Sequence, residues 1–134
     1  MSDPTPFEPV QPPPPSAPLQ TGLSDTAAGA LAYFTFIPAL IFLLVEPYNK
    51  SPFVRFHAWQ SILLSIAAFV ISLVLGICLG VALIFLPYSM HYMLWRLIDL
   101  AWLIVWLLCV VNAFNGKRYK LPVIGALAEK QAGV

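Results

Sequence analysis

Two opposite charges lie inside one long apolar run in the C-terminal half of the chain. Arg96 and Asp99 are three residues apart, a spacing that places both side chains on one face of a helix. Charges inside a membrane are costly and often mark an ion path or a proton relay. We therefore expect Asp99 to be paired with Arg96, or else protonated. The pair could serve transport, or it could only fix the packing of helices.

A second polar group flanks the apolar runs. His57 and Gln60 stand at the start of the central run, and a turn after the last run carries Asn115, Gly116, Lys117, Tyr119 and Pro122. If the chain crosses a membrane three times, all of them meet at one membrane surface. Two roles are open there: the residues cap helix ends and tether loops, or they form a docking surface or the mouth of a polar path.

Catalytic and metal-binding chemistry lacks its usual residues. The sequence contains no HExxH, GxSxG, P-loop or paired cysteine motif. His57 and His91 fall at opposite ends of the central run and cannot share a metal within one chain. Asp99 is the only carboxylate within a span, whereas intramembrane aspartyl proteolysis needs two. We expect a protein without enzymatic activity, cofactor or metal, whose partners are lipid and a membrane protein or a second copy, and not nucleic acid.

Apolar segments long enough to cross a bilayer position these side chains. The 134 residues are 60% hydrophobic and only 10% charged, too apolar for an ordinary soluble domain. The pattern predicts an all-α integral membrane helical bundle with three transmembrane helices, at about 25–45, 60–86 and 93–114. Ser51 and Pro52 start a long second helix, whose first part is expected in the membrane interface. Pro38 is expected to bend the first span.

The ends of the chain differ from this membrane domain, which is expected to cover residues 23–116. Residues 1–22 are rich in proline and predict a disordered tail, whereas residues 117–134 predict a basic cytoplasmic tail. With three spans, most lysines and arginines lie on the side of the C-terminus. The positive-inside rule then predicts a multi-pass protein of the cytoplasmic membrane, with the C-terminus inside and the N-terminus outside.

Small residues recur at spacings of three or four along the central run. They are Ser61, Ser65, Ala68, Ser72, Gly76 and Gly80. In lipid, small residues let a neighbouring backbone approach, and serine hydroxyls bond across helices. We interpret this face as the one that packs against the other helices. Gly76 and Gly80 also match the GxxxG motif, for which packing within one chain and dimerisation are both open.

Two motifs resemble a known family. FHAWQS at 56–61 and AFNGKRYKLPVIGALAE at 113–129 are similar to a large family of small bacterial and archaeal membrane proteins of unknown function. That family is itself similar to the small multi-span import subunit of the chloroplast inner-envelope translocon. The residues that match are His57, Ala58, Gln60, Ala113, Gly116, Tyr119 and Pro122. The resemblance implies a helical membrane protein without enzymatic activity.

Two functions follow as hypotheses. The favoured one is a scaffold or accessory subunit of a membrane complex, with protein translocation as one process that it could serve. The alternative is a small oligomeric transporter or channel that uses Arg96 and Asp99, because three spans can hardly enclose a pore alone.

Overall fold

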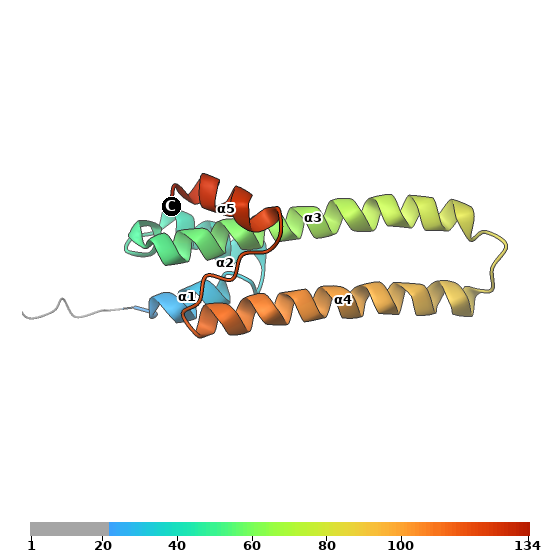
Figure 1. The fold of residues 1–134 in the computed structure, drawn as a ribbon, viewed down its shortest axis with the longest axis horizontal. Helices are drawn as coiled ribbons and strands as arrows, with labels where there is room; N and C mark the ends of the chain where they lie inside the picture. The colour runs from blue at the N-terminus through green and yellow to red at the C-terminus, as the bar shows by residue number, and fades with distance from the viewer. Residues whose placement is uncertain (1–21) are drawn as a thin grey trace, which may run out of the picture.

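The described part of the chain, residues 22–134 of the computed structural model, is built from helices (Figure 1). In chain order they are α1 (Asp25–Leu31), α2 (Phe36–Leu44), the 3-10 turn η1 (Tyr48–Lys50), α3 (Pro52–Ala82), α4 (Tyr88–Phe114) and α5 (Ile124–Ala132). The prediction of an all-α protein is confirmed for these residues. The proline-rich tail lies, except for Gly22, outside the described residues.

Helices α3 and α4 form a long antiparallel hairpin (Figure 1). They contain 31 and 27 residues and are the two described helices long and apolar enough to cross a membrane. At 1.5 Å per residue they measure about 46 and 40 Å, more than a bilayer core of about 30 Å. Helix α3 begins as the sequence predicts, with Pro52 in its first turn and the Ser51 hydroxyl accepting from the amide of Val54.

The first predicted span is wrong, because residues 25–45 form two short helices that fold back on each other. Helices α1 and α2 have seven and nine residues, about 10 and 14 Å, and neither can cross a bilayer. The chain turns between them, and the side chain of Asp25 accepts a hydrogen bond from Ser51 at 2.6 Å. A membrane crossing would instead separate these residues by the thickness of the bilayer. The described chain therefore has two helices that are long and apolar enough to span a membrane, and a pair of short helices that turns back.

Pro38 explains where this segment breaks. In a continuous helix its ring would clash with the carbonyl of Phe34, and it has no N–H to donate. The structure ends α1 at Leu31 and starts α2 at Phe36, after Thr35 in an extended conformation. Pro38 then lies in the first turn of α2, where no helical partner for its nitrogen is missed. The proline thus restarts the helix, whereas the sequence predicted only a bend.

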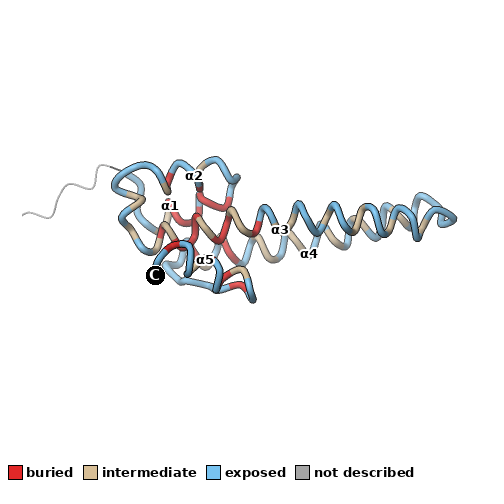
Figure 2. Tube along the Cα trace, turned by 90° about the horizontal axis from the view of Figure 1, so that it is seen from above, coloured by how far each residue is buried: buried red, intermediate tan, exposed pale blue. Residues whose placement is uncertain are grey.

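One end of the hairpin carries a packed helical head, formed by α1, α2, η1, α5 and the adjoining ends of α3 and α4. Figure 2 shows that the buried residues gather in this head, while the rest of the hairpin is exposed. Two apolar clusters fill it: Ala28, Ala32, Ala39, Phe42, Val54 and Ala58 in one, and Ala30, Tyr33, Leu64, Cys109, Ala113 and Leu121 in the other. Alanine supplies four of the six residues of the first cluster and two of the six of the second, and these small side chains let the helices approach closely.

Residues 117–134, for which the sequence predicted a basic cytoplasmic tail, pack against the head in the structure. Gly116, with φ of 71°, ends α4 and redirects the chain. The chain then returns along α3, and α5 packs against α3 with Gly125, Ala128 and Ala132 buried. Small residues on one face of α5 are the reason that this contact can form.

Candidate functional site

Three polar side chains bind one another in the interior of the head. The Tyr33 hydroxyl lies 3.1 Å from Nδ1 of His57, and Nε2 of Gln60 donates to that hydroxyl at 3.0 Å. Because the hydroxyl accepts from Gln60, its own proton can be donated to the imidazole. His57 and Gln60 are fully buried and Tyr33 is 4% exposed. These bonds join the end of α1 to the first half of α3.

Gln60 extends the network to two more segments. Its amide also donates to the carbonyl of Tyr119 at 3.0 Å and approaches Sγ of Cys109 at 3.7 Å. We call Tyr33, His57, Gln60 and the Tyr119 carbonyl the polar knot. It ties α1, α3 and the loop before α5 together, and Cys109 brings in α4. Hydrogen bonds in a dry interior are strong, and an unmade one is expensive, so the knot specifies how these segments assemble.

Two supporting hydrogen bonds hold the turn that follows α1. Nε1 of Trp106 donates to the carbonyl of Tyr33 at 2.7 Å, and the Ser61 hydroxyl donates to the carbonyl of Ala32. These carbonyls lie where the helix is interrupted and have lost their helical partners, so side chains from α3 and α4 replace them. Side chains thus pin the α1–α2 turn to both spanning helices.

The imidazole of His57 is packed on its faces and edges. The Phe53 ring lies 4.5 Å away and the Phe56 ring 5.1 Å away, centroid to centroid. A Cβ atom on Gly29 would come within 3.4 Å of Cδ2 of His57 and within 2.8 Å of the Phe53 ring. Gly29 is therefore the residue that lets α1 approach this ring. Among residues 22–134 no three His, Cys, Asp or Glu side chains lie together as metal ligands would.

The residues proposed for docking divide into a buried and an exposed group. His57 and Gln60 are fully buried. Their burial favours the role in which they cap helix ends and tether loops. The remaining members lie at the surface of the head: Asn115, Gly116, Lys117, Tyr119 and Pro122. The docking hypothesis therefore stays a prediction that concerns the exposed members of this group.

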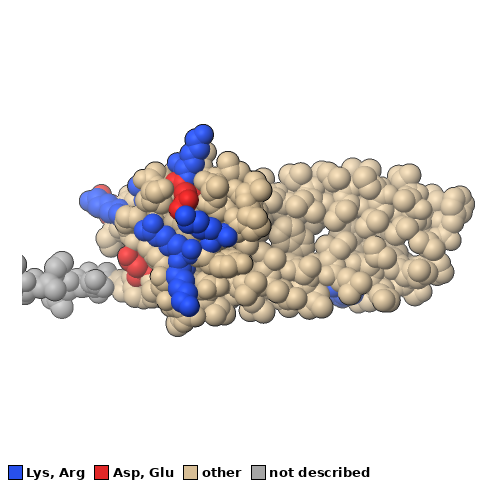
Figure 3. Space-filling view, in the orientation of Figure 1, with Lys and Arg blue, Asp and Glu red and all other residues tan. Residues whose placement is uncertain are grey.

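Basic side chains gather on the head. Figure 3 shows this concentration of positive charge. The basic residues that lie on segments of the head are Arg55, Lys117, Arg118, Lys120 and Lys130. Lys120 pairs with Glu129 at 2.6 Å, and Lys50 pairs with Glu46 at 2.9 Å. The loop after α4 therefore presents positive charge close to the polar knot. We call the exposed side chains of Lys117, Arg118 and Lys130 the basic surface.

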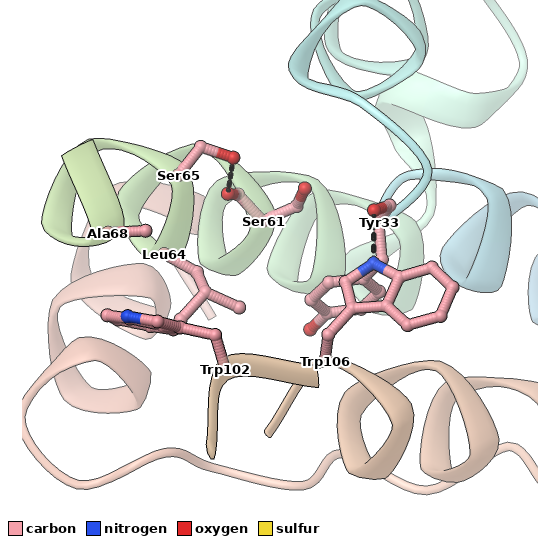
Figure 4. A pocket seen from close by; sticks show the side chains of 7 residues that line it. All are labelled: Tyr33, Ser61, Leu64, Ser65, Ala68, Trp102 and Trp106. Carbon is pink, nitrogen blue, oxygen red and sulfur yellow. Dashed lines mark hydrogen bonds between the residues drawn. The ribbon is translucent and has the colours of Figure 1, made fainter. Parts of the chain in front are cut away.

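The face of small residues on α3 is directed toward tryptophans of α4. Ser61 is buried, and Ser65 and Ala68 line a cavity of about 180 Å³ with Tyr33, Leu64, Trp102 and Trp106 (Figure 4). Farther along, a Cβ atom on Gly76 would lie 3.7 Å from the Trp95 ring, whereas one on Gly80 would meet nothing within 4 Å. Ser72 lies half-buried between these points. The face thus opposes large aromatic residues, and its contact ends before Gly80.

Arg96 and Asp99 form the expected pair on the surface of α4. The guanidinium and carboxylate are 3.8 Å apart, and the two side chains are 63% and 61% exposed. Arg96 also donates from Nε to the Tyr92 hydroxyl at 2.8 Å and lies over the Tyr92 ring. The pair is therefore exposed along a flank of the hairpin and is not enclosed within it.

Sequence reasoning missed three members of the site: Tyr33, Trp106 and Cys109. One signal was available for Tyr33, which is the only residue with a hydrogen-bonding side chain between Ala27 and Phe34. A polar group inside a membrane segment needs a partner. The contributions of Trp106 and Cys109 depend on how α4 lies against the head, which the sequence pattern does not reveal.

Two long apolar helices and a small packed head define a small helical membrane protein. The chain belongs to the magnetosome magnetite crystal formation protein family, whose family model matches residues 22–128. This range includes the polar knot, both spanning helices and the first half of α5.

Relatives with a membrane-protein name cover most of the chain. The UPF0132 membrane protein MJ1443 of Methanocaldococcus jannaschii is 40% identical over 110 residues, which are 81% of this chain and 89% of the relative. A UPF0132 membrane protein of Archaeoglobus fulgidus is 38% identical over 112 residues, 83% of this chain and 98% of its own. No solved structure matches the chain. The resemblance to a small membrane protein family is confirmed, and the similarity to the translocon subunit stays a prediction.

Proposed function

We propose that the protein is a non-enzymatic scaffold or accessory subunit of a membrane complex. The observation that supports this most is the burial of His57 and Gln60 in the polar knot. The side chains best suited to chemistry are engaged in joining four segments of the head. The basic surface of the head and the flanks of the hairpin then remain available to partners.

In this proposal the head lies on the cytoplasmic side of the membrane. The basic residues gather at the head, and the positive-inside rule places such an end in the cytoplasm. Because Asp25 at the start of α1 bonds Ser51 at the start of α3, both helix starts belong to this cytoplasmic side in the proposal. This differs from the orientation expected from three spans, which placed the N-terminus outside.

The descriptions of the family and its relatives leave the scaffold role open. Its description names magnetite crystal formation in magnetosomes, and the archaeal relatives are named only as membrane proteins. A scaffold that positions other proteins at a membrane surface is compatible with both. Protein translocation is one process that such a subunit could serve.

The alternative function is a small oligomeric transporter or channel. The exposed Arg96–Asp99 pair favours it, because intramembrane charges commonly line ion and proton paths. Two spanning helices enclose no pore, so several copies would have to surround the path. The two functions therefore predict different results for the purified protein.

One experiment separates these functions. The tagged full-length protein is purified in mild detergent from its native membrane, as wild type and as the Lys117→Glu/Arg118→Glu variant. We expect a stoichiometric partner that the variant loses and that a matched control, Lys50→Glu, retains. The purified wild type is also reconstituted into liposomes. Ion or solute flux that Asp99→Asn abolishes would contradict the scaffold and support the transporter.

A further inference from the structure

The charge pair of α4 lies near the middle of this helix. Asp99 is two residues and Arg96 five residues from Ala101, the midpoint of α4. At 1.5 Å per residue they are about 3 and 8 Å from the middle of the helix, and a bilayer core extends about 15 Å to each side. Charged side chains at this depth normally face the interior of a bundle, a water-filled cavity or a charged partner.

A single copy of the chain does not meet this requirement. Both side chains are more than 60% exposed, and they approach each other only to 3.8 Å. The Tyr92 hydroxyl is the other polar group bound to Arg96, and it lies on the same flank. Hydrocarbon chains offer neither hydrogen bonds nor charge. A surface with complementary polar groups must therefore cover this flank in the membrane.

We propose that a second copy of this chain covers this flank, with Arg96 of each copy pairing with Asp99 of the other. The patch carries one positive and one negative charge, so it is complementary to itself, as a two-fold interface requires. An axis along the membrane normal keeps equivalent residues at equal depth. Arg96 and Asp99 are offset by only about 4.5 Å along α4, which an arginine side chain can bridge.

The residues beside the charge pair suit such an interface. Tyr92 and Leu103 are each 49% exposed, and Leu107 is 44% exposed. With Arg96 and Asp99 they recur at spacings of three or four, which places them along one flank of the helix. Aromatic and apolar residues around a desolvated charge pair exclude water and lipid from it. This interface does not depend on the scaffold role, because it concerns the hairpin and not the head.

The test uses complementary charge reversal in the full-length chain. Donor- and acceptor-labelled copies are reconstituted in liposomes at low protein density, and their association is measured by energy transfer. We expect Arg96→Asp alone and Asp99→Arg alone to weaken self-association by about tenfold or more. Mixing the two variants places opposite charges across the interface and should restore association. The matched control, Ile104→Leu, changes another exposed residue of α4 without adding polarity and should leave association unchanged.

Neutral variants keep the test decisive if a reversed charge prevents insertion. Arg96→Gln and Asp99→Asn retain polarity without charge, and each should weaken association while the head keeps its unfolding midpoint. Monomeric wild-type protein at every protein-to-lipid ratio would overturn the proposal. So would association unchanged in both neutral variants, or a mixture of folded reversed variants that fails to recover. Retention of a different membrane protein on this flank, lost with Asp99→Asn, would also overturn it.

Discussion

Asp25 accepts a hydrogen bond from the Ser51 hydroxyl at 2.6 Å, although 26 positions separate the two residues. Asp25 opens α1, and Ser51 is the N-cap of α3. The amide of Leu23 adds a second link, because it donates to the Tyr48 hydroxyl at 2.8 Å. The starts of α1 and α3 therefore lie side by side, and the segment between them returns to the side from which it began.

Cysteine labelling tests this topology. Single cysteines at Leu23, Lys50 and Tyr88 are placed in a Cys78→Ala background, and an impermeant thiol reagent is applied to intact and permeabilised cells. We expect the cysteines at 23 and 50 to react only after permeabilisation, because both belong to the head, which the proposed function places in the cytoplasm. The cysteine at 88, at the turn of the hairpin, should react in intact cells. Labelling of positions 23 and 50 from opposite sides of the membrane would show that the segment between them crosses it.

Hydropathy predicted which segments are apolar but not the path that they take. The start of α3 could be predicted because Ser51 and Pro52 act within one turn of the helix. Residues 27–45 are just long enough to span a bilayer. Whether the chain spans or turns back depends on where Pro38 breaks the helix and on which side chains bind the carbonyls at the turn. Those neighbours, Ser61 and Trp106, come from other helices.

The candidate site was predictable in some of its members but not in its burial. His57, Gln60 and the loop after α4 do come together, as their places at the ends of the apolar runs predicted. Whether they face water or the interior depends on how that loop and α5 return over α3. Gly125 allows this return, because its lack of a side chain lets the backbone of Lys120 pass close to α5. The sequence contains Gly125 but does not show which segment packs against it.

The polar knot should behave as one energetic unit. Gln60→Leu removes the donor to Tyr33 and Tyr119, and Tyr33→Phe removes the hydroxyl between Gln60 and His57. Each change leaves buried polar groups unpaired and should lower the free energy of unfolding by about 1–3 kcal/mol. The double variant should lose clearly less than the sum, because both changes break the same bond. Reversible unfolding in mixed micelles measures all three values.

A change to an amide outside the knot provides the comparison. Asn112 is half-buried and donates at 2.7 Å to the carbonyl of Leu108 in its own helix, which keeps its backbone partner, so Asn112→Leu should change stability by no more than about 0.5 kcal/mol. Equal losses for Asn112→Leu and Gln60→Leu, or full additivity of the two knot changes, would contradict the network described here.

Two glycines should respond in opposite ways to alanine. A Cβ atom on Gly125 would lie 2.8 Å from Cα of Lys120, and this backbone atom cannot move aside without shifting the loop. Gly125→Ala should therefore destabilise the head by about 1–3 kcal/mol. On Gly80 the same atom would meet nothing within 4 Å, so Gly80→Ala should be neutral or stabilise by up to about 1 kcal/mol through helix propensity. A loss at Gly80 similar to that at Gly125 would mean that α3 packs tightly there as well.

Val123 occupies a conformation that favours glycine. Its φ is 65° and its ψ is −56°, and the amide of Ile124 donates to the carbonyl of Pro122 at 2.8 Å across it. This is the geometry of a γ-turn of the rare, strained form, and a β-branched side chain is the least suited to it. The side chain is 76% exposed and contributes little packing.

Val123→Gly should therefore stabilise the head, in contrast to most surface changes. Relief of about 1–3 kcal/mol of strain exceeds the conformational entropy of about 0.5–1 kcal/mol that glycine adds to the unfolded chain. Val123→Ala keeps Cβ and serves as the control, so it should gain less than glycine. Unfolding midpoints of the three proteins in the same detergent measure the difference. A glycine variant no more stable than the alanine variant would show that position 123 relaxes out of this turn in the membrane protein.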